Sequence, residues 1–343
     1  SGSRNGMRVA LLLVSLSLLE AAPIVLNQHQ DAVLLHHAAQ PNVWMPVTGL
    51  GTGGYTSEFK TNTSAEAATL LWLKSGGRRI DTALNYGDQV GIGRAMRESG
   101  IPRSDIFVTS KVGPTDPLGF NDTLSQFKAI QDTLQTSYVD LLLIHWPGVR
   151  PKTSNSQNST DPHCQGSLAN SRSCRQSTWR AMMQIFKQGG ARAIGVSNFE
   201  VNHLEDILMM KELVPAVNEF EFHPYWHETD LLKFCLSQKI VVNGYSPLGA
   251  PDVSSASHGW NLLDEPHIVD IASKYKRTPA EVILQWELGQ GVLVNPRTNK
   301  TQHMMENLHF YKPPVPLTAE DFDTISSLKH ADPKICPDPH GIP

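Results

Sequence analysis

The sequence predicts an α/β protein, a single-domain (β/α)8 barrel of the TIM type with long loops over its C-terminal face. Short apolar segments alternate with amphipathic, helix-like segments from residue 46 onward. Eight such apolar segments can be counted, and a strand followed by a helix eight times over builds a closed barrel. With 343 residues, of which 40% are apolar, the chain is long enough for one barrel of this kind.

The eight candidate strands include several near-continuous runs of β-branched residues and Leu, as expected for strands buried on both faces. They cover residues 46–51, 79–82, 106–112, 140–145, 192–197, 216–222, 240–246 and 291–295. Candidate helices cover residues 64–75, 89–99, 123–136, 177–187, 201–210, 228–238 and 263–288, and Ser64, Thr123 and Thr278 are the expected N-caps. A doubly wound open sheet is the alternative, but no Gly-x-Gly-x-x-Gly sequence follows the first strand.

Residues 1–44 are predicted to precede the barrel, which covers 45–330 and is followed by a tail over 331–343. The first six residues resemble the remnant of a tag. Arg8, a short apolar run and the small residues before Pro23 have the layout of a secretory signal peptide. That run is too short to span a bilayer comfortably. A helix of the mature protein is the alternative, because Glu20 is unusual so close to a cleavage site.

Two further features favour a secreted glycoprotein. Glycosylation triplets begin at Asn62, Asn121, Asn158 and Asn299. Cys164 and Cys174 lie in one polar loop at a spacing that suits a local disulfide, whereas Cys235 is expected to be a buried thiol and Cys336 has no evident partner. The predicted location is the lumen of the endoplasmic reticulum or the cell exterior, with the cytoplasm as the alternative.

The charge balance does not point to either of two common classes of partner. A formal net charge of −4 gives no reason to expect nucleic acid or an anionic membrane. The spacing of the four cysteines does not suit a zinc site, so no metal is predicted.

Ionisable side chains stand at the ends of three consecutive candidate strands. Asp81 and Tyr86 follow the second strand, Lys111 ends the third, and His145 ends the fourth. Burying such groups in apolar strands destabilises the fold unless they are paired with other polar groups, so unpaired ones are expected to serve a function. For each residue a structural role is the alternative to a functional one, such as a helix-capping aspartate, a surface tyrosine or a core histidine whose hydrogen bonds are satisfied. Their clustering at one end of the barrel predicts an active site there.

The motifs around these residues resemble the aldo-keto reductase superfamily from about residue 45 to 328. The matching segments are 49–52, 80–83, 86–87, 108–111, 140–147, 193–199, 221–225, 245–249 and 306–307. The resemblance implies the same (β/α)8 barrel, which the strand count predicts independently. It also implies reduction of an aldehyde or ketone by a nicotinamide cofactor, in a protein that is often monomeric.

The resemblance places a catalytic tetrad on Asp81, Tyr86, Lys111 and His145. Tyr86 would act as the general acid that protonates the oxygen left after hydride transfer. An unperturbed tyrosine is a weak acid, and we expect the Lys111 ammonium to lower its pKa. Asp81 would hold Lys111 in place, and His145 would orient the carbonyl oxygen.

The resemblance also assigns a cofactor site. Tyr245 would stack on the nicotinamide, and Ser197, Asn198 and position 219 would hold its carboxamide. The remaining predicted cofactor contacts are Gly51, Thr52, Ser246, Leu248, Arg297, Thr298, His303, Glu306 and Asn307. Two positions depart from the family pattern: Glu219 replaces a glutamine, and His303 replaces an arginine. Arg297 and Thr298 can still bind a 2′-phosphate, so NADPH is favoured and NADH is possible.

Substrate identity is left open. Tyr55, Trp146 and Trp226 are candidate apolar walls of the substrate site, with packing around the rim as the alternative. Loops over 148–176 and 250–260 and the tail are expected over the mouth. A glycan on Asn299 would obstruct the adenosine end of the cofactor site. An exported barrel that serves as a non-catalytic binding or structural protein is therefore the alternative function.

Overall fold

The computed structural model describes residues 31–38, 43–53, 61–148, 158–312 and 316–343. The predicted signal segment and Tyr55 lie outside these ranges. Among the helices of the described residues, none has the length and hydropathy needed to cross a membrane.

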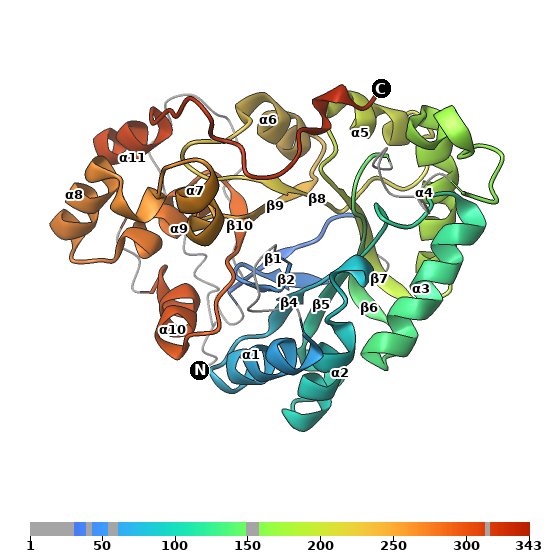
Figure 1. The fold of residues 1–343 in the computed structure, drawn as a ribbon, viewed down its shortest axis with the longest axis horizontal. Helices are drawn as coiled ribbons and strands as arrows, with labels where there is room; N and C mark the ends of the chain where they lie inside the picture. The colour runs from blue at the N-terminus through green and yellow to red at the C-terminus, as the bar shows by residue number, and fades with distance from the viewer. Residues whose placement is uncertain (1–30, 39–42, 54–60, 149–157, 313–315) are drawn as a thin grey trace, which may run out of the picture.

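Eight parallel strands form the barrel that the sequence predicts (Figure 1). They are β3 (Leu50–Gly51), β4 (Arg79–Asp81), β5 (Phe107–Val112), β6 (Val139–Ile144), β7 (Ala191–Ser197), β8 (Val217–Glu221), β9 (Val241–Tyr245) and β10 (Val292–Asn295). Neighbours in the sheet follow the order of the chain. Backbone hydrogen bonds from Gly49 to Val294 and from Gly51 to Pro296 then join the first strand to the last, so the barrel closes.

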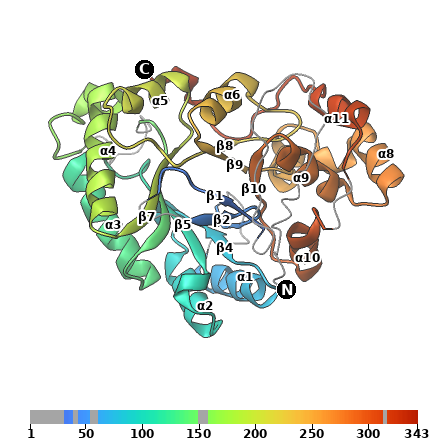
Figure 2. The same cartoon turned by 180° about the vertical axis from the view of Figure 1, so that it is seen from behind.

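Eleven α-helices lie in the described residues, and most of them surround the strands (Figures 1 and 2). They are α1 (Asn62–Lys74), α2 (Gln89–Glu98), α3 (Phe120–Leu134), α4 (Arg172–Lys187), α5 (Val201–Leu208), α6 (Thr229–Ser237), α7 (Pro251–Ser257), α8 (Pro266–Tyr275), α9 (Pro279–Gly289), α10 (Thr301–His309) and α11 (Ala319–Ser326). All seven predicted helical segments are helical, but the sequence prediction missed α7, α10 and α11. Each of these three contains more polar than apolar residues, so their periodic apolar signals are weak.

Three predicted helix boundaries are wrong. Thr61, not Ser64, caps α1, and Ser64 is the return partner in its capping box. Gly119, not Thr123, precedes α3. The predicted helix over 263–288 is two helices, because Lys276 adopts a left-handed conformation and Pro279 starts α9 behind the Thr278 cap.

The fold begins before the predicted boundary at residue 45. Strand β1 (Ala32–Leu34) pairs antiparallel with β2 (Trp44–Pro46). Val33 and Met45 of this hairpin are buried against the apolar side chains of the barrel interior. The stretch just before residue 45, predicted to precede the barrel, therefore contributes to the core because its alternate apolar residues cover the interior of the barrel.

Two apolar layers follow from the alternation of side chains along each strand. In β6, Leu141 and Leu143 belong to the inner layer, whereas Leu142 and Ile144 pack with the helices in the outer one. Cys164 and Cys174 form the predicted disulfide, Cys235 is the predicted buried thiol, and Cys336 is half-buried and forms no disulfide within the described residues.

One buried acid on α9 predicts a pH-dependent stability. Glu287 is fully buried, and neither carboxyl oxygen has a hydrogen-bond partner among the described residues. Burial raises its pKa well above the ordinary value, so the folded protein holds a proton that the unfolded chain releases. The contribution of Glu287 to the free energy of unfolding is therefore greatest below about pH 4.5. It falls as the pH rises, by up to about 1.4 kcal/mol per pH unit.

We expect Glu287→Gln to remove this loss. Thermal unfolding of both proteins between about pH 5 and pH 8 should give a stability difference that grows in favour of the variant as the pH rises. A difference that stays constant over this range would contradict a neutral Glu287.

Candidate active site

A cleft of about 570 Å³ lies at the C-terminal ends of the strands. Asp81, Tyr86 and His145 form part of its wall at one end. Basic side chains, namely Arg297, Lys300 and His303, line it at the other end. Because the strand ends are fixed by the barrel, side chains distant in sequence meet in this cleft.

The four predicted catalytic residues come together. Lys111 on β5 donates to the Asp81 carboxylate on β4, and both side chains are almost fully buried. The Tyr86 hydroxyl lies 3.4 Å from Lys111 Nζ and 3.4 Å from His145 Nε2. Gly53 allows this arrangement, since a Cβ there would stand 2.5 Å from the Tyr86 ring. Tyr86 therefore contacts both its predicted cation and its predicted histidine.

Glu219 is a fifth member of this group of side chains, although the sequence predicted a different contact for it. It was expected to hold a carboxamide, but its Oε1 lies 3.2 Å from Lys111 Nζ. Its Oε2 accepts a hydrogen bond of 2.6 Å from Asn243 on β9. Lys111 therefore lies between two carboxylates. The departure from glutamine at position 219 was the available signal, but sequence alone did not show that the side chain reaches the lysine.

The pKa of Tyr86 differs from the expectation. Burial raises it above its ordinary value, Lys111 opposes this only in part, and Asp81 and Glu219 raise it further. The expected net lowering is thus wrong for the protein without cofactor, although Lys111 does act in the predicted direction. Burial alone would lower the pKa of Lys111, but Asp81 and Glu219 raise it well above its usual range. At neutral pH the pair is a phenol beside an ammonium.

Amide and aromatic groups lie beside the tetrad. Asn198 donates to the carbonyl of His145 at 3.0 Å and accepts from the Tyr245 hydroxyl at 2.7 Å. Its left-handed backbone lets it turn sharply after β7, next to Ser197. Tyr245, Ser197 and Asn198 all line the cleft. A planar ring that carries an amide would find an aromatic face and polar partners here.

The other predicted site residues divide into two groups. Gly51, Thr52, Trp146, Ser246, Leu248, Arg297, Thr298 and His303 line the cleft. Glu306 and Asn307 lie on α10 and are not part of the cleft wall. Trp226 is also outside the cleft wall, and the Lys334 ammonium lies 4.1 Å from the centre of its ring. Trp226 therefore packs under the tail and does not form a substrate wall.

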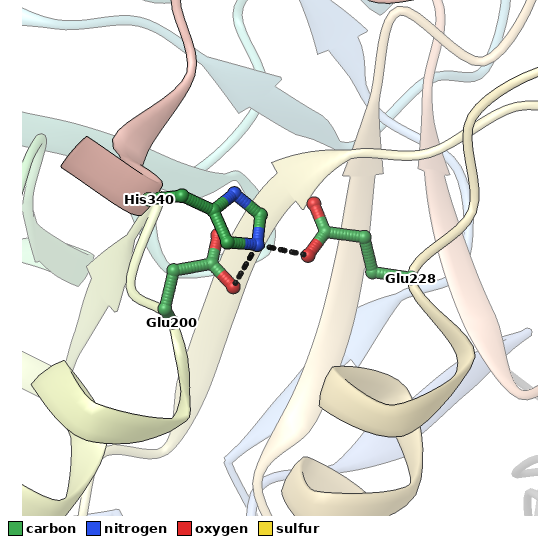
Figure 3. A group of neighbouring side chains, drawn as sticks. All are labelled: Glu200, Glu228 and His340. Atoms are coloured by element: carbon green, nitrogen blue, oxygen red, sulfur yellow. Dashed lines mark ion pairs between the residues drawn. The ribbon is translucent and has the colours of Figure 1, made fainter.

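The C-terminal tail forms part of the mouth, as expected. Ile335 and Cys336 line the cleft, and their backbone N–H groups donate to the buried Glu221 carboxylate at 2.6 and 2.8 Å. Further along, His340 lies between Glu200 and Glu228, at 3.5 and 3.6 Å (Figure 3). These contacts fix the tail across the helix starts of α5 and α6.

The chain was compared with known proteins and structures. The model of the aldo/keto reductase family matches residues 48–330. The chain belongs to the aldo/keto reductase family.

Its relatives include reductases and a dehydrogenase. Glyoxal reductase of Bacillus subtilis is 35% identical over 310 residues, which cover 90% of this chain and 96% of the relative. Glycerol 2-dehydrogenase (NADP(+)) of Saccharomyces cerevisiae is 34% identical over 313 residues, or 89% of this chain and 93% of that one. The crystal structure of an aldo/keto reductase from Brucella melitensis aligns with a TM-score of 0.71 at 32% identity, covering 86% of this chain and 98% of that one.

The cleft suits the nicotinamide cofactors that aldo/keto reductases use. One end offers an aromatic ring, a hydroxyl and an amide, and the other offers cationic side chains for phosphate groups. Arg297 already forms an ion pair of 2.5 Å with Asp252 on α7, across this second end. Thr298 lies 3.4 Å from His303, so these two predicted contacts form one polar group.

Proposed function

We propose that this protein reduces an aldehyde or ketone to an alcohol with NADPH, and that Tyr86 is the general acid. The observation that carries the proposal is the position of the Tyr86 hydroxyl in the cleft wall, 3.4 Å from both Lys111 Nζ and His145 Nε2. A proton donor between a cation and an imidazole can protonate an oxygen that gains negative charge.

Each residue then has a distinct role. When bound, the reduced nicotinamide supplies the hydride for the carbonyl carbon. His145 and Tyr86 bind the carbonyl oxygen, and the Tyr86 proton moves to that oxygen as charge develops there. Lys111 stabilises the resulting phenolate, and Asp81 keeps the ammonium oriented. Bulk water then returns the proton to Tyr86.

Preference for NADPH is supported by the basic end of the cleft. Arg297, Lys300 and His303 line it, and a 2′-phosphate needs such partners. Asp252 competes for Arg297, so the phosphate must share or replace that ion pair. The names of the glyoxal and glycerol enzymes make small aldehydes the first substrates to test.

The proposal includes a monomer in the secretory pathway. The Cys164–Cys174 disulfide supports an oxidising compartment. Asn299 is exposed and lines the cleft at the Arg297 end, so a glycan there would oppose cofactor binding. A reductase of this kind should therefore carry no glycan at Asn299, which mass spectrometry of the secreted protein would test.

The test of function is fluorescence titration with NADPH and NADH, followed by turnover of a small aldehyde. We expect micromolar binding of NADPH, binding of NADH weaker by at least about tenfold, and consumption of NADPH that depends on the aldehyde. If neither cofactor binds, the reductase is excluded and the barrel is better explained as a binding protein.

A further inference from the structure

Glu219 is the acidic group that the proposed mechanism does not use. It lies in the middle of β8 with only 2% of its surface exposed, and it still contributes to the cleft wall. Its two oxygens contact Lys111 Nζ at 3.2 Å and Asn243 Nδ2 at 2.6 Å. Since Asp81 already pairs with Lys111, Glu219 is a second carboxylate on one ammonium.

The charges around this carboxylate are arranged unevenly. Two carboxylates, Asp81 and Glu219, and two cations, Lys111 and Arg79, are buried together in the barrel. Their formal charges cancel. However, the two carboxylates form part of the cleft wall, and neither cation does. Arg79 lies deeper, where it donates to the carbonyl of Val294 on β10. When Glu219 is ionised, a group bound in this part of the cleft therefore lies beside two carboxylates, in a site of low dielectric constant.

We propose that the Glu219 carboxylate selects the oxidation state of the bound cofactor, favouring the cationic oxidised nicotinamide over the neutral reduced one. This inference rests on the proposed function, which places the nicotinamide beside Tyr245, Asn198 and position 219. Attraction between the Glu219 carboxylate and the oxidised nicotinamide shifts the equilibrium between bound substrates and bound products towards the alcohol. The same attraction slows release of the oxidised cofactor.

The selection depends on pH. Burial and the neighbouring Asp81 raise the pKa of Glu219 to about 8, while Lys111 and the hydrogen bond from Asn243 oppose this. Tyr86 is the other titratable group facing the pair, and Arg79 is the remaining cation. Glu219 is thus mostly protonated at about pH 6.5 and mostly ionised at about pH 9. By linkage, binding of the oxidised cofactor should lower the pKa of Glu219 and release a proton.

Glu219→Gln is a well-matched variant. The glutamine carbonyl can accept from Lys111, and its NH2 group needs an acceptor in place of the donor that Asn243 now presents. Asn243 Oδ1 has no hydrogen-bond partner among the described residues, so a flip of this amide supplies that acceptor. Asp252→Asn is the control, because it removes a carboxylate from the other end of the same cleft.

The experiment measures dissociation constants of NADP+ and NADPH by calorimetry from about pH 6.5 to 9, in buffers of different ionisation enthalpy. In the unchanged protein, we expect the ratio of the NADPH dissociation constant to the NADP+ dissociation constant to rise by about tenfold between about pH 6.5 and pH 9. Proton release should accompany NADP+ binding near pH 7.5. Both effects should vanish in Glu219→Gln and persist in Asp252→Asn.

The outcomes separate this inference from the proposed function. If both nucleotides bind but Glu219→Gln shows the same ratio and the same proton release as the unchanged protein, the role of Glu219 is overturned and the reductase stands. If neither nucleotide binds to the unchanged protein, the proposed function is overturned, and the role of Glu219 with it.

Discussion

Tyr86→Phe is expected to lower kcat for aldehyde reduction by about 10³-fold while leaving the affinity for NADPH nearly unchanged. The substitution removes one oxygen, the proton donor that lies 3.4 Å from Lys111 Nζ and from His145 Nε2. The ring, which packs against Gly53, stays in place. Stopped-flow measurement of NADPH oxidation, with a separate binding titration, tests both parts.

Tyr138→Phe is the matched control, because it also removes a phenolic hydroxyl. Tyr138 lies outside the cleft, where its ring packs under Arg103. We expect its turnover to equal that of the unchanged protein. If Tyr86→Phe retained more than about a tenth of the activity, another group would have to supply the proton.

Lys111→Met is expected to abolish turnover and to lower the free energy of unfolding by about 3–5 kcal/mol at alkaline pH. Lys111 is 1% exposed and is the cation that contacts Asp81 and Glu219. Without it the two carboxylates face each other in the barrel interior, and the repulsion between two ionised groups there destabilises the folded state. Stability should then be greatest at low pH and fall as the pH rises. Urea unfolding at about pH 6 and pH 9 measures this slope.

Two controls isolate the cause. Adding Asp81→Asn and Glu219→Gln to Lys111→Met removes both buried charges, and most of the pH-dependent loss should disappear. Lys128→Met, which breaks an exposed pair with Asp132, should change stability by less than about 1 kcal/mol. A loss from Lys111→Met that is equal at both pH values would indicate a packing defect and not unpaired charge.

Much of the site was predictable because it depends on short, continuous stretches of sequence. Several of the eight strands carry near-continuous apolar runs, and Asp81, Lys111 and His145 stand at or near the ends of strands. A barrel brings consecutive strand ends together, so their proximity follows from the topology alone. The Cys164–Cys174 disulfide was also predictable, because the two cysteines are separated by only 10 positions in the sequence, although Cys174 lies in the first turn of α4.

Other features depend on contacts between distant segments. The hairpin of β1 and β2 closes the interior with residues before the predicted domain start. Ile335 and Cys336 reach the cleft because Glu221 accepts hydrogen bonds from their backbone. Trp226 was named as a substrate wall, but it packs beneath Lys334. No periodic pattern marks such pairs, since each depends on the path of a loop or tail.

The sequence by itself determined the barrel, the family and the four side chains that meet at the strand ends, because residue type and order along the strands set these. The tertiary structure decided the electrostatics. It placed Glu219 on β8 at 3.2 Å from Lys111 on β5, and it placed the half-buried Tyr86 where desolvation raises the pKa that Lys111 was expected to lower. Charge interactions and desolvation depend on distance and burial in three dimensions, which only the closed barrel defines.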